Sequence, residues 1–282
     1  MDIAFIKLDD KAAKFVLSGA TPAFANTLRR AMISEVPTLA IEDVRIYDNT
    51  SVVFDEILAH RLGLIPIRTD LSVYVPRSEC TCGEAGCPIC TSTYTLSVEG
   101  PRTVYSRDLI PQDPGAVPAE EDIPIIELFE GQKIVLEAHA IVSTGREHVK
   151  WQPTTACGYK NYPVVRINEA ICDACGMCIE ECPRGVLQVE DRRLQVVEER
   201  LELCSLCRLC ERACLSGGIG EEPAIHIDAD ESRFIFVVES DGSMPVQEII
   251  ERALHYIQKK SDDLVEVLTE ISGVAVDEEI RY

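Results

Sequence analysis

The sequence predicts an α+β protein divided into more than one domain. Length is the first reason, because 282 residues exceed one average domain of roughly 150 residues. The second reason is that segments with strand alternation and segments with helical spacing are mixed along the chain. The third is that the 13 cysteines are grouped, four at 80–90 and eight at 172–214, with Cys157 alone. The cysteine groups therefore separate regions that differ in chemistry.

The composition is that of an acidic globular protein. Its 27 Lys and Arg against 48 Asp and Glu give a net charge of −21, so we expect no direct nucleic-acid role, which would need clustered basic residues. No run approaches the roughly 20 apolar residues of a membrane span, and the N-terminus lacks a signal-peptide pattern. We expect a cytoplasmic protein, in which clustered cysteines indicate metal or redox sites rather than disulfides.

The N-terminal elements are a strand pair and a helix. Residues 3–16 predict two strands around a polar turn at 7–11. A helix begins at Thr21 and Pro22, because Thr caps free N–H groups and Pro suits the first helical position. It ends near Glu35, since Pro37 disfavours the α conformation before it. Its apolar residues recur every four positions in one stripe, formed by Phe24, Leu28 and Met32.

The later elements end in a long helix. A short helix is expected at 55–62, and strands at 71–75, 91–98 and 133–142. Residues 244–271 have helical apolar spacing and would span about 40 Å. Their stripe includes Ile250, Leu254, Ile257, Leu264 and Leu268. Periodicity alone leaves two interpretations open, a helix packed on its own sheet and a helix that also presents this stripe to a partner.

The strongest chemical signal is C-x2-C-x2-C-x3-C, which occurs twice at an offset of 32 residues. Three thiolates spaced every three residues on a tight loop can face one cubane, whereas the fourth starts the next element and points away. In two-cluster ferredoxins this fourth cysteine ligates the other cluster. By that logic, one [4Fe–4S] cluster takes Cys172, Cys175, Cys178 and Cys214, and the second takes Cys182, Cys204, Cys207 and Cys210.

Strand-like segments flank both motifs, so residues 161–225 resemble the two-cluster bacterial ferredoxin fold. Leu215 is a departure, because the ferredoxin family usually has Pro after the fourth cysteine. The alternative is structural zinc. It is disfavoured because zinc sites use cysteine pairs separated by a longer loop rather than three cysteines within seven residues.

The first cysteine group is a compact knuckle, C-x-C-x4-C-x2-C, formed by Cys80, Cys82, Cys87 and Cys90. Gly83, Gly86 and Pro88 supply tight turns. The spacing suits one tetrahedral structural zinc, and the alternative is free or oxidisable thiols. Cys157 is interpreted as a small buried side chain.

No independent catalytic site is expected. The sequence contains no H-E-x-x-H, G-x-S-x-G or P-loop motif. Its five histidines are scattered, and no aspartate cluster has the close spacing of a magnesium site. The chain is therefore predicted to be no enzyme by itself.

Two segments resemble a known family. N-T-L-R-R at 26–30 and D-E-I-L-A-H-R-L-G-L-I-P at 55–66 are similar to the signature of the alpha-like assembly subunits of cellular RNA polymerases. The resemblance is most specific to the archaeal branch of this family, some members of which carry a ferredoxin-like insertion. It spans nearly the whole chain. The knuckle is similar to that of the eukaryotic counterpart, with one extra residue in its middle spacer.

The resemblance implies a domain layout and a set of partners. The dimerisation domain would comprise 1–41 and 226–282, the insert domain with the zinc knuckle 42–160, and the ferredoxin-like domain 161–225. The chain would be a non-catalytic subunit of DNA-directed RNA polymerase that forms a heterodimer with subunit L. This pair would be the platform for the large catalytic subunits and the small subunits N and P.

The resemblance also assigns contact residues. The subunit L interface would use the stripes of both long helices, namely Phe24, Leu28, Met32, Ile250, Leu254, Ile257, Leu264 and Leu268. Arg29 and Arg30 match the family motif near the large-subunit contact, and their alternative is an exposed helix face.

A role for the clusters follows from the size of the inserted segment. About 65 residues form only a small core, so metal ligation is expected to hold the domain folded and to support or regulate assembly. The alternative function is a ferredoxin-type electron-transfer protein, and the two polymerase-like segments count against it.

Overall fold

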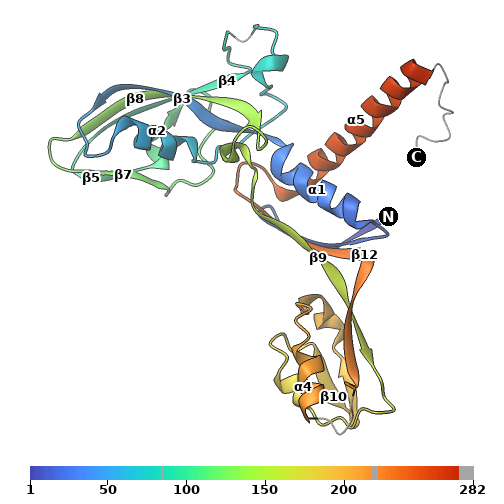
Figure 1. Ribbon diagram of the computed structural model, residues 1–282. Coiled ribbons are helices and arrows are strands. Elements are labelled where there is room, and N and C mark those ends of the chain that lie inside the picture. Colours follow the sequence, from blue (N-terminus) through green and yellow to red (C-terminus); the bar gives the residue numbers. More distant parts are fainter. Residues whose placement is uncertain (84, 218–221, 273–282) are drawn as a thin grey trace. The chain divides into compact units, whose positions relative to one another are not determined.

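The computed structural model describes residues 1–83, 85–217 and 222–272 (Figure 1). The secondary structure is mixed α and β. The strands are β1 (Asp2–Leu8), β2 (Ala12–Ser18), β3 (Pro37–Asn49), β4 (Thr91–Glu99), β5 (Arg102–Tyr105), β6 (Ile110–Pro111), β7 (Pro124–Leu128), β8 (Lys133–Thr144), β9 (Thr154–Ile167), β10 (Leu187–Glu190), β11 (Arg193–Val196) and β12 (Ile225–Ser240). The helices are α1 (Pro22–Ser34), α2 (Asp55–Gly63), α3 (Met177–Glu180), α4 (Leu209–Gly217) and α5 (Val246–Ser272). Short 3-10 helices are η1 (Arg77–Glu79), η2 (Ser106–Asp108), η3 (Val149–Trp151) and η4 (Glu198–Leu203).

Most predicted elements are confirmed to within a few residues. The strand pair, both N-terminal helices, the strands at 91–98 and 133–142 and the long final helix are present. The start of α1 has its expected cap, because the Thr21 hydroxyl accepts the Phe24 N–H at 3.2 Å. These boundaries follow from local chemistry that the sequence displays directly.

The predicted strand at 71–75 is wrong. Residues 71–73 form a turn instead. The Asp70 carboxylate accepts the Ser72 backbone N–H at 2.8 Å, and the Asp70 carbonyl accepts the Tyr74 N–H at 3.0 Å. These local hydrogen bonds compete successfully with a sheet ladder, as is common for Asp.

The chain forms two compact units, which are described separately. One comprises 1–6, 14–25 and 159–236, and the other comprises 7–13, 26–158 and the chain from Val237 onward. The boundary crosses β9 and β12, the neighbouring strands of a sheet ordered β1-β2-β12-β9. Figure 1 shows β9 leading into the inserted segment and β12 leading out of it.

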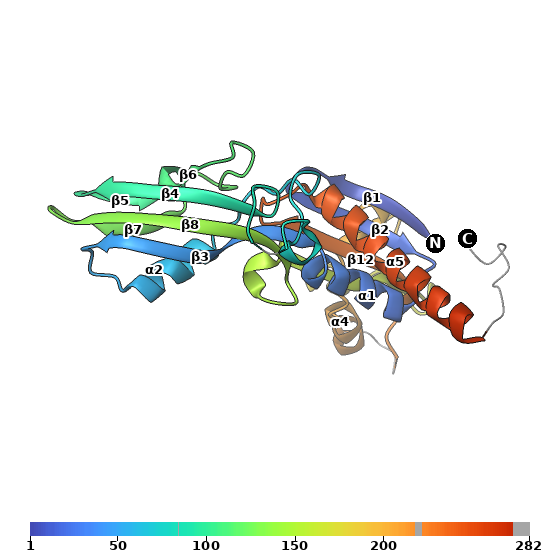
Figure 2. The same ribbon diagram turned by 90° about the horizontal axis from the view of Figure 1, so that it is seen from above.

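The larger core belongs to a second sheet, ordered β3-β8-β4-β6. β8 alternates between buried and more accessible residues, which is the period of a strand with one buried face. It pairs antiparallel with β3, where Leu39 faces Val142, and with β4, where Leu96 faces Leu136. Leu58 and Leu62 of α2 are fully buried in the same core, and Figure 2 shows the helix beside this sheet.

The inserted segment has a small core with unusual composition. The cluster of buried residues that forms this core has eight members, and three of them are the cysteines Cys178, Cys204 and Cys210. Its sheet is the two-stranded hairpin β10-β11, closed by Asp191 and Arg192 with φ of 49° and 61°. An isolated hairpin is marginally stable in water. The apolar core and the sheet therefore contribute little to the stability of this segment without the cysteines.

The helix α5 changes character along its length. Its first turns are buried at Val246, Ile249 and Ala253, whereas all residues from 258 to 271 except Thr269 are exposed. The described residues therefore leave the apolar side chains in the second half of α5 uncovered.

Within the described ranges, no helix combines the length and apolar content that a membrane crossing needs.

Candidate functional site

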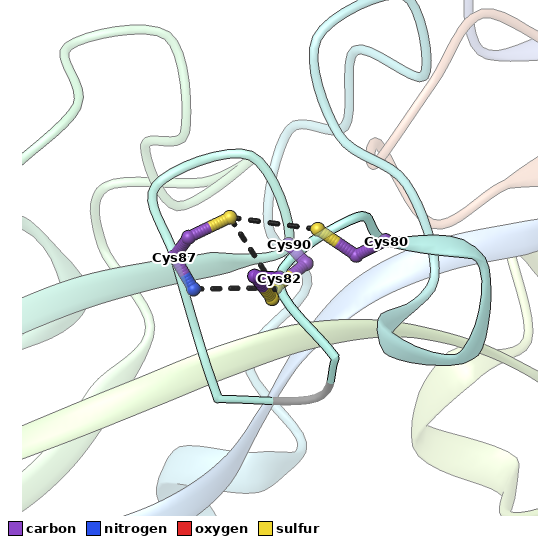
Figure 3. A group of neighbouring side chains, drawn as sticks. All are labelled: Cys80, Cys82, Cys87 and Cys90. Atoms are coloured by element: carbon purple, nitrogen blue, oxygen red, sulfur yellow. Dashed lines mark hydrogen bonds between the residues drawn. The ribbon is translucent and has the colours of Figure 1, made fainter.

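The knuckle cysteines converge on one point (Figure 3). The Sγ atoms of Cys80 and Cys87 are 3.5 Å apart, those of Cys82 and Cys90 are 3.7 Å apart, and those of Cys87 and Cys90 are 3.9 Å apart. A tetrahedral zinc with Zn–S bonds of about 2.3 Å requires sulfur separations of about 3.8 Å. All four sulfurs lie within 4.8 Å of one another, so the group could hold one metal ion.

Tight turns produce this geometry. Gly83 and Gly86 have φ of 61° and 82°, which glycine adopts without cost. The Cys87 backbone N–H points to the Cys90 sulfur at 3.4 Å. A hydrogen bond from the Cys80 thiol lowers the pKa of Cys82 to about 6. The knuckle thus favours a thiolate, the form that binds metal, near neutral pH.

The eight remaining clustered cysteines form two groups in space. Burial raises the pKa of Cys178 to about 11, and the next contributions come from the charges of Cys214, Cys175 and Cys172. These four are called set 1. Burial likewise raises the pKa of Cys210 to about 11, with further contributions from Cys182, Cys204 and Cys207. These four are called set 2, and they line one cavity of about 300 Å³ that includes space open to solvent.

Each set contains three cysteines from one motif and the fourth from the other. The two sets have the same members as the crossed ligand assignment. The Cys214 sulfur also accepts the Ala224 N–H at 3.2 Å, a type of contact that stabilises a thiolate. The fold therefore brings the fourth cysteine of each motif close to the first three cysteines of the other motif.

The backbone repeats as the sequence does. Ala174 and Gly176 have φ of 54° and 85°, and the residues 32 positions later, Leu206 and Arg208, have φ of 56° and 57°. Holding a non-glycine residue in this conformation costs of order 1–3 kcal/mol. The two motif loops thus share a left-handed backbone conformation at equivalent positions.

The spacing of sets 1 and 2 differs from that of the knuckle. Among the described residues, the knuckle is the one group of three or more Cys, His, Asp or Glu whose ligand atoms all lie within 4.8 Å of one another. The thiols of sets 1 and 2 are therefore too far apart to share a single ion. Such spacing suits a larger group that places iron and sulfide between the thiolates.

Three residues of the predicted partner interface lie in the chain's own core. Leu28 and Met32 are 0% exposed, and Ile250 is 4% exposed. Because side chains without accessible surface cannot contact another protein, the assignment of Leu28 and Met32 to the subunit L interface is corrected. Ile250 keeps only a small accessible area. This part of the apolar stripe is buried, as an apolar helix face should be, but the residues that pack against it belong to the same chain.

The remaining interface candidates keep accessible surface. Phe24, Leu254 and Ile257 are half-buried. Leu264 and Leu268 are 59% and 54% exposed. Ile271, which the prediction did not include, continues this face one turn further and is also exposed. The second half of α5 is thus an uncovered apolar stripe of more than two turns.

The motif residues near the predicted large-subunit contact have mixed roles. Arg29 donates from Nε and Nη2 to the Asn26 side-chain oxygen, at 3.2 and 3.0 Å, while Arg30 is exposed. In the second motif, Leu58 and Leu62 are buried, and Arg61 Nη1 donates to the Ile125 carbonyl at 2.8 Å. Much of this motif therefore stabilises the fold around α2.

Sequence reasoning did not identify an exposed apolar group beside α2. Tyr47, Val52, Phe54 and Ile57 are between 49% and 78% exposed. The apolar run at 52–54 directly before a helix start was the available signal. Its exposure could not be read from a pattern of three residues.

Comparison with known proteins gives a consistent result. The model of the RNA polymerase Rpb3/Rpb11 dimerisation domain matches residues 14–261. The chain is 51% identical to DNA-directed RNA polymerase subunit Rpo3 of Methanosarcina mazei and 49% identical to that of Methanosarcina acetivorans, covering 96% of this chain and 99% of each relative. It is 42% identical to the Rpo3 subunit of Archaeoglobus fulgidus, over 96% of this chain and 98% of that protein.

Proposed function

The chain belongs to the RNA polymerase Rpb3/Rpb11 dimerisation-domain family, and from this we propose that it pairs with an Rpb11-like subunit, the archaeal subunit L, to start polymerase assembly. It is a non-catalytic subunit of DNA-directed RNA polymerase, as its Rpo3 relatives are. The pair serves as the platform for the large catalytic subunits and the small subunits N and P. Catalysis takes place in the other subunits of the enzyme.

The single observation that carries the pairing proposal is the uncovered half of α5. Leu264 and Leu268 are more than half exposed on a helix whose first turns are fully packed. Obligate interfaces are more apolar than ordinary surfaces, and a helix stripe is a common means of pairing. Phe24, Leu254 and Ile257 extend the proposed contact.

Affinity purification of the chain from its own cells, followed by identification of the bound proteins, tests this function. We expect an Rpb11-like subunit and the large polymerase subunits. Recovery of electron-transfer reductases in place of polymerase subunits would favour the alternative of a ferredoxin-type carrier and contradict the proposal.

The proposed function assigns different roles to three regions of the chain. Residues 1–41 and 226–282 form the dimerisation domain, 42–160 the insert domain and 161–225 the ferredoxin-like domain. Residues 218–221 and 273–282 lie outside the described residues. For the large-subunit contact, we propose exposed Arg30, with Arg29 beside it, and the apolar group around Phe54 on the same chain.

We propose that the knuckle holds one structural zinc. Four thiolate ligands would leave a tetrahedral ion no open coordination position, so the ion would fix the loop before β4 and catalyse nothing.

Replacing Cys87 or Cys90 with serine is expected to remove this zinc. The measurement is metal content by mass spectrometry, with about one zinc per chain in the wild type and close to none in the variants. Cys157→Ser is the matched control, because Cys157 lies outside all three cysteine groups, and it should keep the metal. Equal zinc in the Cys87 variant and the control would contradict the assignment.

We also propose that set 1 and set 2 each hold a [4Fe–4S] cluster. Support comes from the crossed grouping of the thiols, their separation beyond the range of one ion and the repeated loop conformation. Their main contribution is folding energy for the inserted segment, whose own apolar core is small. Through that segment they support, and can regulate, association with the large subunits.

A further inference from the structure

The surroundings of the two cysteine sets differ in charge. Four basic residues lie around set 2: Lys160, Arg184, Arg208 and Arg212. Arg184 and Arg208 line the same cavity as the set 2 cysteines, and Arg212 is close enough for its charge to act on Cys207. The nearby carboxylates have partners, since Glu211 pairs with Arg208 at 3.8 Å and Glu202 pairs with Lys14 at 3.3 Å.

Set 1 has an acidic side chain beside one of its cysteines. The Asp173 carboxylate accepts the Cys175 N–H at 3.2 Å, so a negative charge lies beside that ligand. Glu180 occupies the position in the first motif that Arg212 occupies 32 residues later. At this one position the repeat keeps the cysteine spacing and replaces an acidic residue with a basic one.

Lys160 makes the closest of these contacts. Its Nζ donates to the carbonyl of Cys204 at 2.6 Å. The side chain is only partly exposed, and Glu202, an acidic residue nearby, pairs with Lys14 rather than with Lys160. Among the described residues, no carboxylate forms an ion pair with Lys160. Its ammonium group instead faces the backbone carbonyl of Cys204, a proposed cluster ligand.

We propose that Lys160 is a positioning residue for set 2, and that Lys160, Arg184 and Arg212 make the set 2 cluster the more easily reduced of the two, because the charge of Arg208 is offset by Glu211. The inference rests on the proposed clusters. Lys160 holds the loop through the Cys204 carbonyl and keeps a positive charge beside the site. Local charge is a principal control of Fe–S potentials, and attraction between a cation and an added electron grows as solvent is excluded.

The redox step is a one-electron reduction. A chemical donor, dithionite in the experiment, is oxidised and supplies one electron, and the cluster core changes from 2+ to 1+. No proton transfer is needed. The added negative charge is stabilised by the cations around set 2 and destabilised by Asp173 beside set 1.

A dithionite titration of the complete chain in its heterodimer, followed by electron paramagnetic resonance, tests this inference. We expect two reduction steps. In Lys160→Met, the reduced-to-oxidised ratio at the higher-potential step should fall about tenfold at fixed potential, equivalent to about 59 mV. Lys160→Arg should restore the wild-type step. Arg192→Gln removes the same charge at the exposed β10-β11 turn and should change neither step.

Asp173→Asn provides the reciprocal test and should raise only the lower-potential step. If Lys160→Met fails to take up iron, exposed Arg212→Gln replaces it, with the same expected direction. An unchanged higher-potential step, or a change in the lower one alone, overturns the inference. Iron analysis before titration separates this result from failure of the cluster proposal, in which the wild-type chain itself would lack iron.

Discussion

Replacing Leu264 and Leu268 together with aspartate is expected to weaken pairing with an Rpb11-like subunit at least 100-fold, a change of about 2.7 kcal/mol. Both side chains are more than half exposed in the chain alone, so the substitution removes little of its own packing. In the heterodimer it would bury two carboxylates against an apolar surface, which is costly without partners. The dissociation constant, measured by calorimetric titration, is the readout.

Lys259→Asp is the matched control for this double variant. It changes the charge by the same two units. Position 259 lies nine residues before Leu268, which places it on the opposite side of the helix at 3.6 residues per turn. We expect nearly wild-type affinity from it. A similar loss in both variants would attribute the effect to charge in general, and no loss in the double variant would exclude this stripe from the interface.

Replacing Cys172 and Cys204 with serine is expected to unfold the inserted segment while pairing with the Rpb11-like subunit survives. Each substitution removes one proposed ligand, Cys172 from set 1 and Cys204 from set 2. The segment would retain a small apolar core, a two-stranded hairpin and strained loop residues at Ala174, Leu206 and Arg208. Metal ligation would be the largest favourable contribution that is lost.

Hydrogen exchange is the measurement for this second prediction. Amides of β10 and β11 should lose most of their protection, because local opening would become nearly free. A pull-down should show weaker binding of the large subunits and an intact heterodimer. Cys157→Ser is the control. Retained protection would contradict the folding role, whereas lost protection with unchanged large-subunit binding would contradict the regulatory role.

The grouping of the cysteines was the most predictable part of the molecule. Cysteine spacing alone placed the knuckle thiols together, and the structure has their sulfurs at metal-binding separations. The repeat at 172–214 supplied the crossed assignment, because the fourth cysteine of each motif starts a new element. The sequence predicts such groups because a few cysteines at fixed spacing largely determine which thiols can come close to one another.

The apolar stripes of the helices could be predicted, but the surfaces that pack against them could not. Periodicity marks Leu28 and Ile250 as well as Leu264 and Leu268 as apolar-face residues. The structure buries the first two and exposes the last two. The pattern is the same whether the covering surface comes from the same chain or from another one. Only the tertiary packing of the first turns of α5 separates these cases.

Two other features show where sequence patterns are insufficient. The apolar residues at 71–75 suggested a strand, but hydrogen bonds within four residues of Asp70 formed a turn. Lys160 belongs to no motif, since its contact with Cys204 joins residues 44 positions apart. A single sequence shows neither which of two competing local hydrogen-bond patterns will form nor which residues far apart in the chain will meet.

Native mass spectrometry of a stepwise reconstitution decides whether the chain is the assembly platform. The chain is mixed first with its Rpb11-like partner and then with the large subunits. We expect a one-to-one heterodimer in the first step, and binding of the large subunits to that pair but not to either member alone. A chain that stays alone or pairs with itself, or large subunits that bind it without the partner, would refute the platform role.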